Sequence, residues 1–330
     1  MADVTTLRVG GSAARFVDAT GDEEVLAEVR DADSHGRPLL VMGGGSNLIV
    51  GDDGFSGTVL RISTRGLEED GDVVRAAAGE DWDGFVARMV AEGRSGVETL
   101  AGIPGRVGAT PLQNVGAYGA EIAESLLQVL AFDRDGHRLV SLTNRQCGFS
   151  YRHSVFKGSD RFVVLAVHFA LPAARTSAPI RYAELARALG VEVGATAPLA
   201  DVREAVLRLR RSKGMVLDAA DHDTWSAGSF FTNPILTAEQ AAALPDGAPR
   251  FAADGGVKTS AAWLIEQAGF PKGYGAGPAT LSTKHTLAVT NRGTATAADV
   301  LDLAREIREE VEKRFGIRLV PEPVVVGATL

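Results

Sequence analysis

The sequence predicts a fold of mixed helices and strands, arranged in about two domains or three small ones. Its 330 residues are about twice the ~150 residues of a typical domain. Hydrophobic residues make up 45% and charged residues 23%, as in ordinary globular proteins, which excludes a disordered chain, a collagen and a coiled coil. Short apolar runs also alternate with amphipathic stretches, which indicates that both strands and helices contribute.

The first hundred residues are expected to hold several strands and one helix. Apolar runs at 38–42 and 59–62 predict two strands with a glycine-rich loop between them, and residues 73–78 predict a third. Residues 81–92 have the spacing of an amphipathic helix, which Gly93 ends.

The middle of the chain is expected to be mostly strand. Residues 126–133, 138–142 and 162–171 are predicted strands, and residues 199–213 are predicted to form a basic helix. Between them, residues 172–198 are rich in alanine and proline and mark a candidate border between domains.

The last part of the chain is predicted to contain two helices and two strands. Residues 258–268 favour a helix, and residues 286–291 favour a strand. The clearest helix follows Thr296, because Thr296 and Asp299 have the spacing of a capping box and the following apolar residues share one face. A final strand is predicted over 318–326.

Charge and cysteine content exclude several classes of function. Lys and Arg number 34 against 42 Asp and Glu, a net charge of −8 with no basic block, so we expect no nucleic-acid partner. Cys147 is the single cysteine and the six histidines are scattered, so we expect no disulfide and no metal. The N-terminus does not predict a signal peptide, and the longest apolar stretch, 162–174, is too short for a membrane span. We therefore expect a cytoplasmic protein.

Glycine is the most informative residue type, with 38 in the chain and a concentration in a few short loops. The loop GGGSN at 43–47 offers consecutive backbone N–H groups and short polar side chains, the material of an anion-binding nest. It matches neither the dinucleotide fingerprint GxGxxG nor the P-loop. Taken alone, the loop favours the alternative of a plain glycine-rich β-turn.

A second glycine-rich loop changes this balance. Residues 102–119 contain glycine at 102, 105, 108, 116 and 119 and have no periodicity. Long loops without secondary structure in compact domains are usually functional, although a surface Ω-loop is the alternative. Two such loops can clamp a pyrophosphate from both sides.

Nine segments spread along the chain carry a resemblance to one enzyme family. They are TTLRVGGSA (5–13), VMGGGSNLIV (41–50), GIPGRVGATPLQNVGAYGAEI (102–122), CGFSYRHSVFK (147–157), RRSKG (210–214), SAGSFFTNP (226–234), KTSAAWLIEQAGF (258–270), STKHTLAVTN (282–291) and FGIRLVPEPVVVG (315–327). In this order they resemble the UDP-N-acetylenolpyruvoylglucosamine reductases, flavoenzymes that make UDP-N-acetylmuramate for bacterial peptidoglycan. GGGSN alone is weakly specific, whereas all nine segments in this order are highly specific.

The resemblance implies an α+β fold: an FAD-binding fold of the vanillyl-alcohol oxidase type, in two α+β subdomains, and a C-terminal α/β substrate-binding domain. On this basis residues 1–62 form the first FAD-binding subdomain, joined by the C-terminal strand 318–330. Residues 63–200 form the second subdomain, and residues 201–317 form the substrate-binding domain. The segment around Tyr182 resembles the subclass in which a tyrosine-bearing loop folds over the substrate.

The resemblance also implies the reaction and its catalytic residues. NADPH would reduce a non-covalently bound FAD, which would then reduce the enolpyruvyl group of UDP-N-acetylglucosamine enolpyruvate; both partners are small molecules, and we expect a monomer. Ser229 in AGSFF matches the family's proton donor, Arg152 in SYRHS matches the arginine that holds the substrate carboxylate, and Glu322 in VPEPVVV matches the second acid. Without these motifs, Ser229 would be interpreted as a packed hydroxyl and Arg152 as a surface residue.

Two further sets of residues match positions at which the family binds its ligands. The expected FAD contacts are Gly43, Gly44, Gly45, Ser46, Asn47, Gly105, Thr110, Asn114, Gly116 and Ala117. The expected contacts with the sugar nucleotide are Tyr118, Tyr151, Tyr182, Lys213, Asn233, Lys272 and His285.

The chain departs from the family pattern between Lys213 and Ser229. A short proline-containing stretch of the family is replaced there by GMVLDAADHDTWSA. Two other functions stay open at this point: an FAD-dependent oxidase of the same fold that uses oxygen, and a UDP-sugar-binding sensor without catalysis. The joint presence of Arg152, Ser229 and Glu322 argues against the sensor.

Overall fold

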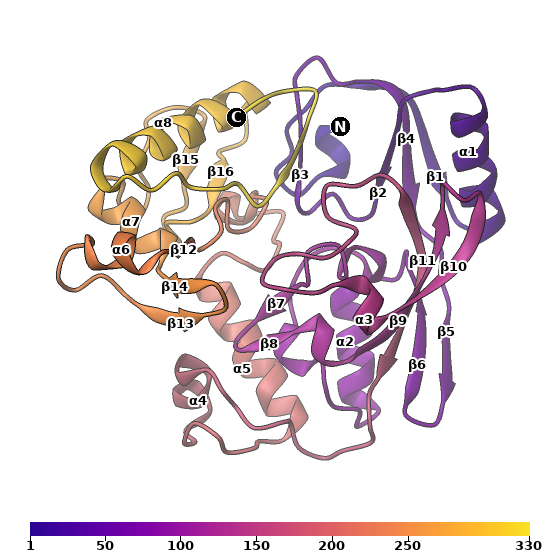
Figure 1. Cartoon of the computed structure of the whole chain (residues 1–330), viewed down its shortest axis with the longest axis horizontal. Helices are drawn as coiled ribbons and strands as arrows, with labels where there is room; N and C mark the ends of the chain where they lie inside the picture. Colours follow the sequence, from indigo (N-terminus) through magenta and orange to yellow (C-terminus); the bar gives the residue numbers. More distant parts are fainter. The chain divides into compact units, whose positions relative to one another are not determined.

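The computed structural model describes residues 1–330 and forms two compact units (Figure 1). Unit 1 consists of residues 1–12, 45–55 and 213–330, and unit 2 consists of residues 13–44 and 56–212. The sequence also predicts two FAD-binding subdomains and a substrate-binding domain. The two units do not test this division, which stays a prediction.

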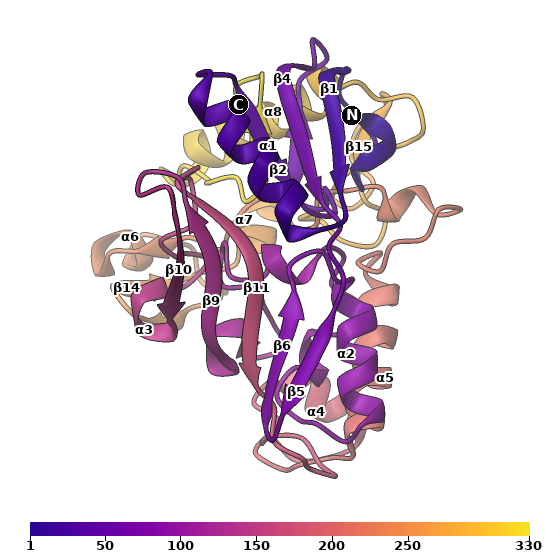
Figure 2. The same cartoon turned by 90° about the vertical axis from the view of Figure 1, so that its right-hand side faces the viewer.

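Unit 2 is built on two main sheets. The smaller sheet has the strand order β1-β4-β2, and the larger, antiparallel sheet has the order β10-β9-β11-β6-β5 (Figure 2). Its strands are β1 (Ala13–Ala19), β2 (Leu39–Met42), β4 (Phe55–Ile62), β5 (Leu67–Asp70), β6 (Val73–Ala77), β7 (Gly116–Ala117), β8 (Ala120–Glu121), β9 (Leu126–Asp133), β10 (Arg138–Thr143) and β11 (Phe162–Ala170). Its helices are α1 (Asp22–Ser34), α2 (Trp82–Ala91), α3 (Asn144–Cys147), α4 (Ala183–Leu189) and α5 (Leu199–Ser212), with 3-10 turns at Glu98–Leu100, Val107–Ala109 and Ile122–Glu124.

An aromatic cluster joins α2 to the larger sheet of unit 2. Trp82 and Phe85 on α2 lie 6.1 and 5.1 Å from Phe169 on β11, measured between ring centroids. The indole Nε1 of buried Trp82 donates a hydrogen bond of 2.9 Å to the carbonyl oxygen of Leu100. The core therefore fixes the point at which the second glycine-rich loop begins.

Unit 1 contains short strands and the longest helix. Its strands are β3 (Leu48–Val50), β12 (Ile235–Leu236), β13 (Phe251–Ala253), β14 (Gly256–Lys258), β15 (Ala279–Leu281), β16 (Val289–Asn291) and β17 (Val324–Val326). Its helices are α6 (Ala238–Ala242), α7 (Ala261–Gln267) and α8 (Ala297–Phe315), with 3-10 turns at Ala2–Val4 and His222–Thr224. Strand β17 pairs in parallel with β3, β15 pairs with β16, and β12, β14 and β13 form a three-stranded antiparallel sheet.

The long helix α8 confirms its sequence prediction. Thr296 and Asp299 form the capping box, and Gly316 ends the helix in the left-handed conformation with φ of 66°. Most of the apolar face, including Val300 and Ile307, is buried in the core of unit 1, and Phe315 at its end is half-buried against that core. Local capping by Thr296 and tertiary packing of the apolar face therefore stabilise the same helix.

Four predicted elements have clearly different bounds in the structure. Strand β4 begins at Phe55 instead of residue 59, and β16 spans only Val289–Asn291 of the predicted 286–291. Residues 258–268 do not form one helix, because Lys258 ends strand β14 and the Ser260 side chain caps α7 at the amide of Trp263. The predicted final strand 318–326 is also too long, since β17 spans only Val324–Val326. Proline has no N–H to donate, so the prolines on both sides of Glu322 keep that residue outside the ladder.

Other elements were not predicted. Strand β3 follows the first glycine loop directly, α1 buries only Val25, Val29 and Ala32 beneath an acidic surface, and α4 lies within the candidate border segment. None of the helices combines the length and the apolar character that crossing a bilayer requires. The structure contains no cluster of three or more His, Cys, Asp or Glu side chains suited to a metal ion.

Candidate active site

The two glycine-rich loops meet inside unit 2. A Cβ placed on Gly44 would lie 3.0 Å from the Cα of Gly105, and one placed on Gly43 would lie 3.2 Å from the Cβ of Arg106. Gly105 itself has φ of +131°, which favours glycine. A side chain on Gly44 would meet backbone, which cannot move aside. These glycines therefore build a cradle in which two backbones approach closely, a geometry suited to a phosphate-bearing group.

The rest of the second loop packs against the sheet of unit 2. A Cβ on Gly108 would lie 2.5 Å from the Cβ of Ala78, just beyond strand β6. The hydroxyl of buried Thr110 donates to the carbonyl oxygen of Val107 at 2.8 Å. The side chain of Thr110 thus shapes the loop from within.

Asn114 links this loop to the segment that carries Arg152. Its φ is +49°, and its side chain is buried. The amide Nδ2 donates to Glu121 Oε2 at 2.7 Å and to the carbonyl oxygen of Ser150 at 3.1 Å, while Oδ1 accepts from the amide of Ala123 at 3.1 Å. A side chain with these three bonds braces the loop, and both of its N–H donors are used, so an FAD contact by Asn114 would use its backbone or the remaining lone pair of Oδ1.

Arg152 is held against the same loop. Its φ of +52° is in the left-handed region that favours glycine, and its Nη2 donates to the carbonyl oxygen of Gly116 at 3.0 Å. The guanidinium also lies 5.4 Å from the ring centroid of Tyr151. A Cβ on Gly116 would approach Nη1 to 3.2 Å, so the glycine gives the guanidinium its room. Gly116 and Ala117 form β7, paired with β8.

Tyr118 and Tyr182 meet edge to face in unit 2. Their ring centroids are 5.7 Å apart with an interplanar angle of 89°, and Tyr182 precedes α4 with 45% of its surface exposed. Burial raises the pKa of the Tyr118 phenol to about 12, although the positive charge of Arg210 acts in the opposite direction. Burial also lowers the pKa of the Arg210 guanidinium to about 10. The structure therefore adds Arg210 to the residues that surround the Tyr118 phenol.

Sequence reasoning missed Arg210 although it lies in the motif RRSKG. Two adjacent arginines at the end of a basic helix look alike in sequence, whereas in the structure Arg210 is half-buried and interacts electrostatically with Tyr118, and Arg211 is exposed. No signal in a single sequence distinguishes them.

In unit 1, the end of the first glycine loop contacts the segment of Glu322. The side-chain amide of Asn47 donates to the carbonyl oxygen of Glu322 at 3.1 Å, and the carbonyl oxygen of Asn47 accepts from the amide of Val324 at 3.0 Å. Thr6 supports the loop from the other side, since its amide donates to the carbonyl oxygen of Gly45 and its hydroxyl to that of Ser46. Asn47 and Glu322, predicted from distant motifs, are thus brought together.

Ser229 directly precedes Phe230, the residue whose backbone binds the amide of Glu322. It is half-buried in an irregular stretch between Gly228, with φ of +76°, and buried Phe230. The carbonyl oxygen of Phe230 accepts from the amide of Glu322 at 2.8 Å, and the amide of Phe230 donates to the carbonyl oxygen of Leu287 at 2.7 Å. The backbones of Ser229 and Glu322 are therefore neighbours in unit 1.

The remaining expected substrate contacts in unit 1 are more scattered. Asn233 uses its Oδ1 to accept from the amide of Ala261 at the start of α7, at 2.9 Å. His285 is half-buried in the loop between β15 and β16, Lys272 is exposed after α7, and half-buried Lys213 is the first residue of the unit's long C-terminal part. These residues belong to separate segments of unit 1, and their common contact with the sugar nucleotide stays a prediction.

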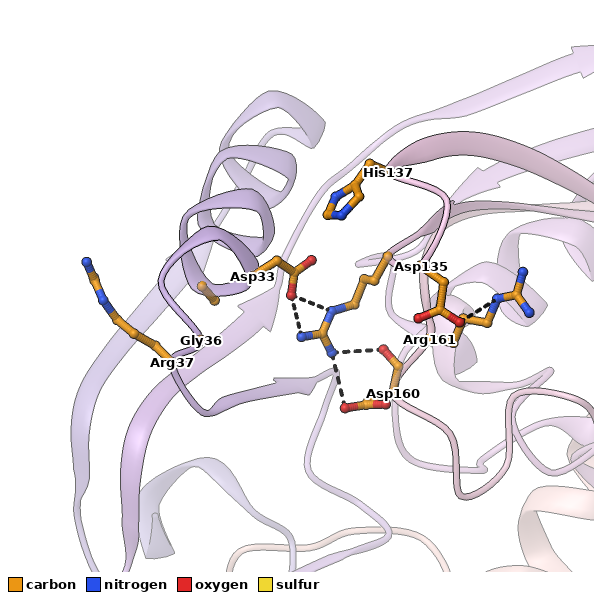
Figure 3. Close-up of a pocket in the computed structure, with 9 residues that line it drawn as sticks. Asp33, Gly36, Arg37, Asp135, His137, Asp160 and Arg161 are labelled. Atoms are coloured by element: carbon orange, nitrogen blue, oxygen red, sulfur yellow. Dashed lines mark hydrogen bonds and ion pairs between the residues drawn. The ribbon is translucent and has the colours of Figure 1, made fainter.

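A surface hollow of unit 2 contains several charged residues but offers no free charge (Figure 3). Arg134 pairs with Asp33 and Asp160, and Arg161 pairs with Asp135. Since these arginines already have carboxylate partners, the hollow joins α1 to the β9–β10 hairpin and is not the candidate site.

Comparisons with known proteins assign the chain to a family. Residues 219–326 match the model of the UDP-N-acetylenolpyruvoylglucosamine reductase C-terminal domain, and residues 13–141 match that of an FAD binding domain. The reductase of Thermobifida fusca is 58% identical over 100% of this chain and 97% of its own length. The chain belongs to the UDP-N-acetylenolpyruvoylglucosamine reductase family. The reductase of Streptomyces coelicolor is 59% identical over 100% of this chain and 90% of its own.

A solved structure agrees with this membership over nearly the whole fold. The UDP-N-acetylenolpyruvylglucosamine reductase of Thermus caldophilus is 26% identical, with a TM-score of 0.70 over 98% of this chain and 96% of its own. The resemblance drawn from the nine segments is therefore confirmed. The expected fold class, a flavin-binding α+β fold with a C-terminal domain, is confirmed as well.

Proposed function

We propose that this chain catalyses the reduction of the enolpyruvyl group of UDP-N-acetylglucosamine enolpyruvate to give UDP-N-acetylmuramate, with NADPH as the reductant. The observation that carries the proposal is the 58% identity to the Thermobifida fusca reductase over both chains. We further propose that the enzyme acts in the cytoplasm as a monomer and belongs to the subclass with a tyrosine-bearing substrate loop.

The glycine cradle of unit 2 fits FAD. At the contact of the loops Gly44 faces the backbone of Gly105, Gly43 faces the side chain of Arg106, and Gly105 has a φ that favours glycine, and such backbone suits a pyrophosphate. Further contacts are assigned to Gly45, Ser46, Asn47, Thr110, Asn114, Gly116 and Ala117. FAD, when bound, supplies the hydride that the protein cannot supply itself. We expect it to be non-covalent, because the first loop lacks the histidine that anchors flavin in covalent relatives.

Arg152 would act on the substrate carboxylate. Addition of hydride to the enol ether leaves negative charge on the neighbouring carbon, which must spread into the carboxylate. A guanidinium binds a carboxylate through two parallel hydrogen bonds and stabilises that charge as it develops. The bond from Arg152 to Gly116 supports this role, because it fixes the side chain before substrate arrives.

Glu322 would assist at the same dianionic group. In its protonated form the carboxyl would donate a hydrogen bond to that charge. The flanking prolines and the bonds to Asn47 and Phe230 hold its backbone.

Ser229 would deliver the proton that completes the reduction. Its hydroxyl is a weak acid, but the enolate carbon is a strong base, so transfer is favourable. Its place beside Phe230, whose carbonyl oxygen binds Glu322, supports a common task for the two side chains.

The sugar nucleotide would contact Tyr118, Tyr151, Tyr182, Lys213, Asn233, Lys272 and His285. The edge-to-face pair of Tyr118 and Tyr182 supports the tyrosine-loop subclass, because the exposed ring of Tyr182 can leave Tyr118 and cover a ligand. The three-part division into residues 1–62 with 318–330, 63–200 and 201–317 belongs to the same proposal.

Product analysis tests this function. Purified protein incubated with NADPH and the enolpyruvate should yield a product two mass units heavier, since one hydride and one proton are added. An oxidase would instead consume oxygen with an alcohol substrate, and a sensor would bind the UDP-sugar tightly without forming product. Either result would overturn the proposal.

A further inference from the structure

Residues 214–227, where the chain departs from the family pattern, are tied closely into unit 1. The carbonyl oxygen of Trp225 accepts from the amide of Asn291 at 3.0 Å, and that of Ser226 accepts from the hydroxyl of Thr6 at 2.7 Å. Ser226 also forms an antiparallel bridge with Thr290 on β16. The segment therefore runs beside β16 and ends two residues before Ser229.

The centre of this segment is the buried carboxylate of Asp223, of which 5% is exposed. Its Oδ1 accepts from the amide of Thr283 and from Nη1 of Arg292, each at 2.9 Å, and its Oδ2 accepts from the hydroxyl of Thr283. Asp221 acts beside it: one oxygen accepts from the amide of Asp223 and the other binds the ammonium of Lys284. Both acids thus hold the loop that joins β15 to β16.

This loop, residues 282–288, connects Asp223 to the candidate site. Asp223 holds the start of the loop at Thr283, and Phe230, which directly follows Ser229, holds its end at Leu287. His285 lies between these two attachments. A displacement of Asp223 would therefore shift both the residue expected to contact substrate and the residue expected to donate the proton.

A buried carboxylate is costly unless its partners are well placed. Removal of the acid would leave the Thr283 amide and the Arg292 guanidinium without the acceptor that they share, so this network fixes the geometry of the loop that it holds. Building on the proposed function, we propose that Asp223 is a positioning residue for the half-reaction in which the enolpyruvate is reduced. The reduction of flavin by NADPH does not involve the proton donor and does not depend on Asp223.

The two half-reactions, followed separately by stopped-flow flavin absorbance, test this inference. In Asp223→Ala, flavin content and bleaching by NADPH should stay near wild type. Recolouring of the reduced enzyme by UDP-N-acetylglucosamine enolpyruvate should slow about 10- to 100-fold, as expected for a displacement on the order of 1 Å. The matched control is Asp218→Ala in the same segment, whose exposed carboxylate accepts from the amide of Ala220. It should leave both half-reactions unchanged.

The conservative variant Asp223→Asn separates hydrogen bonding from charge. An Asn oxygen can accept from the Thr283 amide and Arg292, while its NH₂ donates to the Thr283 hydroxyl once that hydroxyl rotates. Asp223→Asn should therefore restore most of the recolouring rate. If Asp223→Ala does not fold, Thr283→Val removes one bond and should slow recolouring alone.

The outcomes against the proposal are distinct. Three results would overturn the inference and leave the proposed function standing. The first is a recolouring rate that is the same in Asp223→Ala and Asp218→Ala, and the second is equal slowing of both half-reactions in Asp223→Ala. The third is a recolouring rate in Asp223→Asn that is no faster than in Asp223→Ala. A wild-type enzyme that is bleached by NADPH but never recoloured by the enolpyruvate would overturn the proposed function, and this inference with it.

Discussion

At the scale of single residues, several residues that are predicted to contact a ligand also form hydrogen bonds that stabilise the fold. Asn114 uses three side-chain bonds to join the glycine loop to Ser150, and Asn233 uses its carbonyl oxygen to start α7. A motif identifies such residues without saying whether side chain or backbone meets the ligand. The sequence therefore pointed to Asn47, Asn114 and Arg152, which the structure places at the glycine loops, but not to the bonds that each one makes, because hydrogen-bond partners far along the chain leave no local pattern. The ligand contacts themselves stay a prediction.

Tyr182 is predicted to contribute to substrate binding more than to chemistry. Its exposed ring rests only edge-on against Tyr118, so it is available to cover a ligand. Tyr182→Ala should raise KM for the enolpyruvate about tenfold, equivalent to about 1.4 kcal/mol, and leave kcat nearly unchanged. Phe251→Ala, which removes another exposed aromatic ring, is the control in the steady-state assay. Equal falls in kcat and kcat/KM would place Tyr182 in the transition state instead.

Ser229 is predicted to act in only one half-reaction. Ser229→Ala removes one oxygen from a half-buried side chain, so fold and flavin content should persist. Recolouring by the enolpyruvate should slow about 10²- to 10⁴-fold, the usual contribution of a general acid, while bleaching by NADPH stays near normal. The exposed serine variant Ser34→Ala should affect neither rate. Unchanged recolouring in Ser229→Ala would show that Ser229 is only a packed hydroxyl.

At the scale of elements, the accuracy of prediction followed the strength of the local signals. The capping box and apolar face of α8 agree with each other, so that helix was predicted well. The helix expected over 258–268 failed at its start because Lys258 pairs with Ile235 and Phe251, partners that periodicity does not reveal. The contact of the two glycine loops was anticipated as a clamp, but the close approach of Gly44 and Gly105 required the structure.

That approach predicts a loss of flavin in Gly44→Ala. The added methyl group would lie 3.0 Å from the Cα of Gly105, so backbone would have to move apart at the cradle. The molar ratio of FAD to purified protein should fall well below that of wild type. Gly21→Ala, where a Cβ meets nothing within 4 Å, serves as the control. Full flavin occupancy in Gly44→Ala would exclude the cradle from the FAD site.

The pairing of β1 with β4 predicts a loss of stability in acid. Hydrogen bonds from Arg61 and Ser63 lower the pKa of Asp18 from 3.8 to about 2. A carboxyl with a depressed pKa in the fold stabilises it at pH above about 4, and this contribution is lost as pH falls toward 2. Solvent screens this carboxylate, 39% of which is exposed, so we expect at most about 1 kcal/mol.

Urea unfolding at pH 5 and pH 3 measures this contribution. At pH 5, Asp18→Asn should have a lower free energy of unfolding than wild type. At pH 3, the difference in free energy of unfolding between the two proteins should be smaller. A difference independent of pH would contradict the assigned pKa shift.

At the scale of the whole molecule, each unit brings together residues that are far apart in sequence. Asn47, Ser229 and Glu322 become neighbours in unit 1, and in unit 2 the loop of Asn114 contacts the segment that carries Arg152. Spacing alone does not predict such neighbours; the nine motifs in order identified the family, and family membership gave their roles. Asp223 and Arg210 escaped notice because their significance lies in burial.

The central claim is that one chain carries electrons from NADPH to an enol ether through a bound flavin. Anaerobic stopped-flow absorbance of the purified enzyme tests it most directly. One equivalent of NADPH should bleach the flavin, and one equivalent of UDP-N-acetylglucosamine enolpyruvate, added without oxygen, should restore the colour with formation of UDP-N-acetylmuramate. Colour that returns only when air is admitted would contradict the claim.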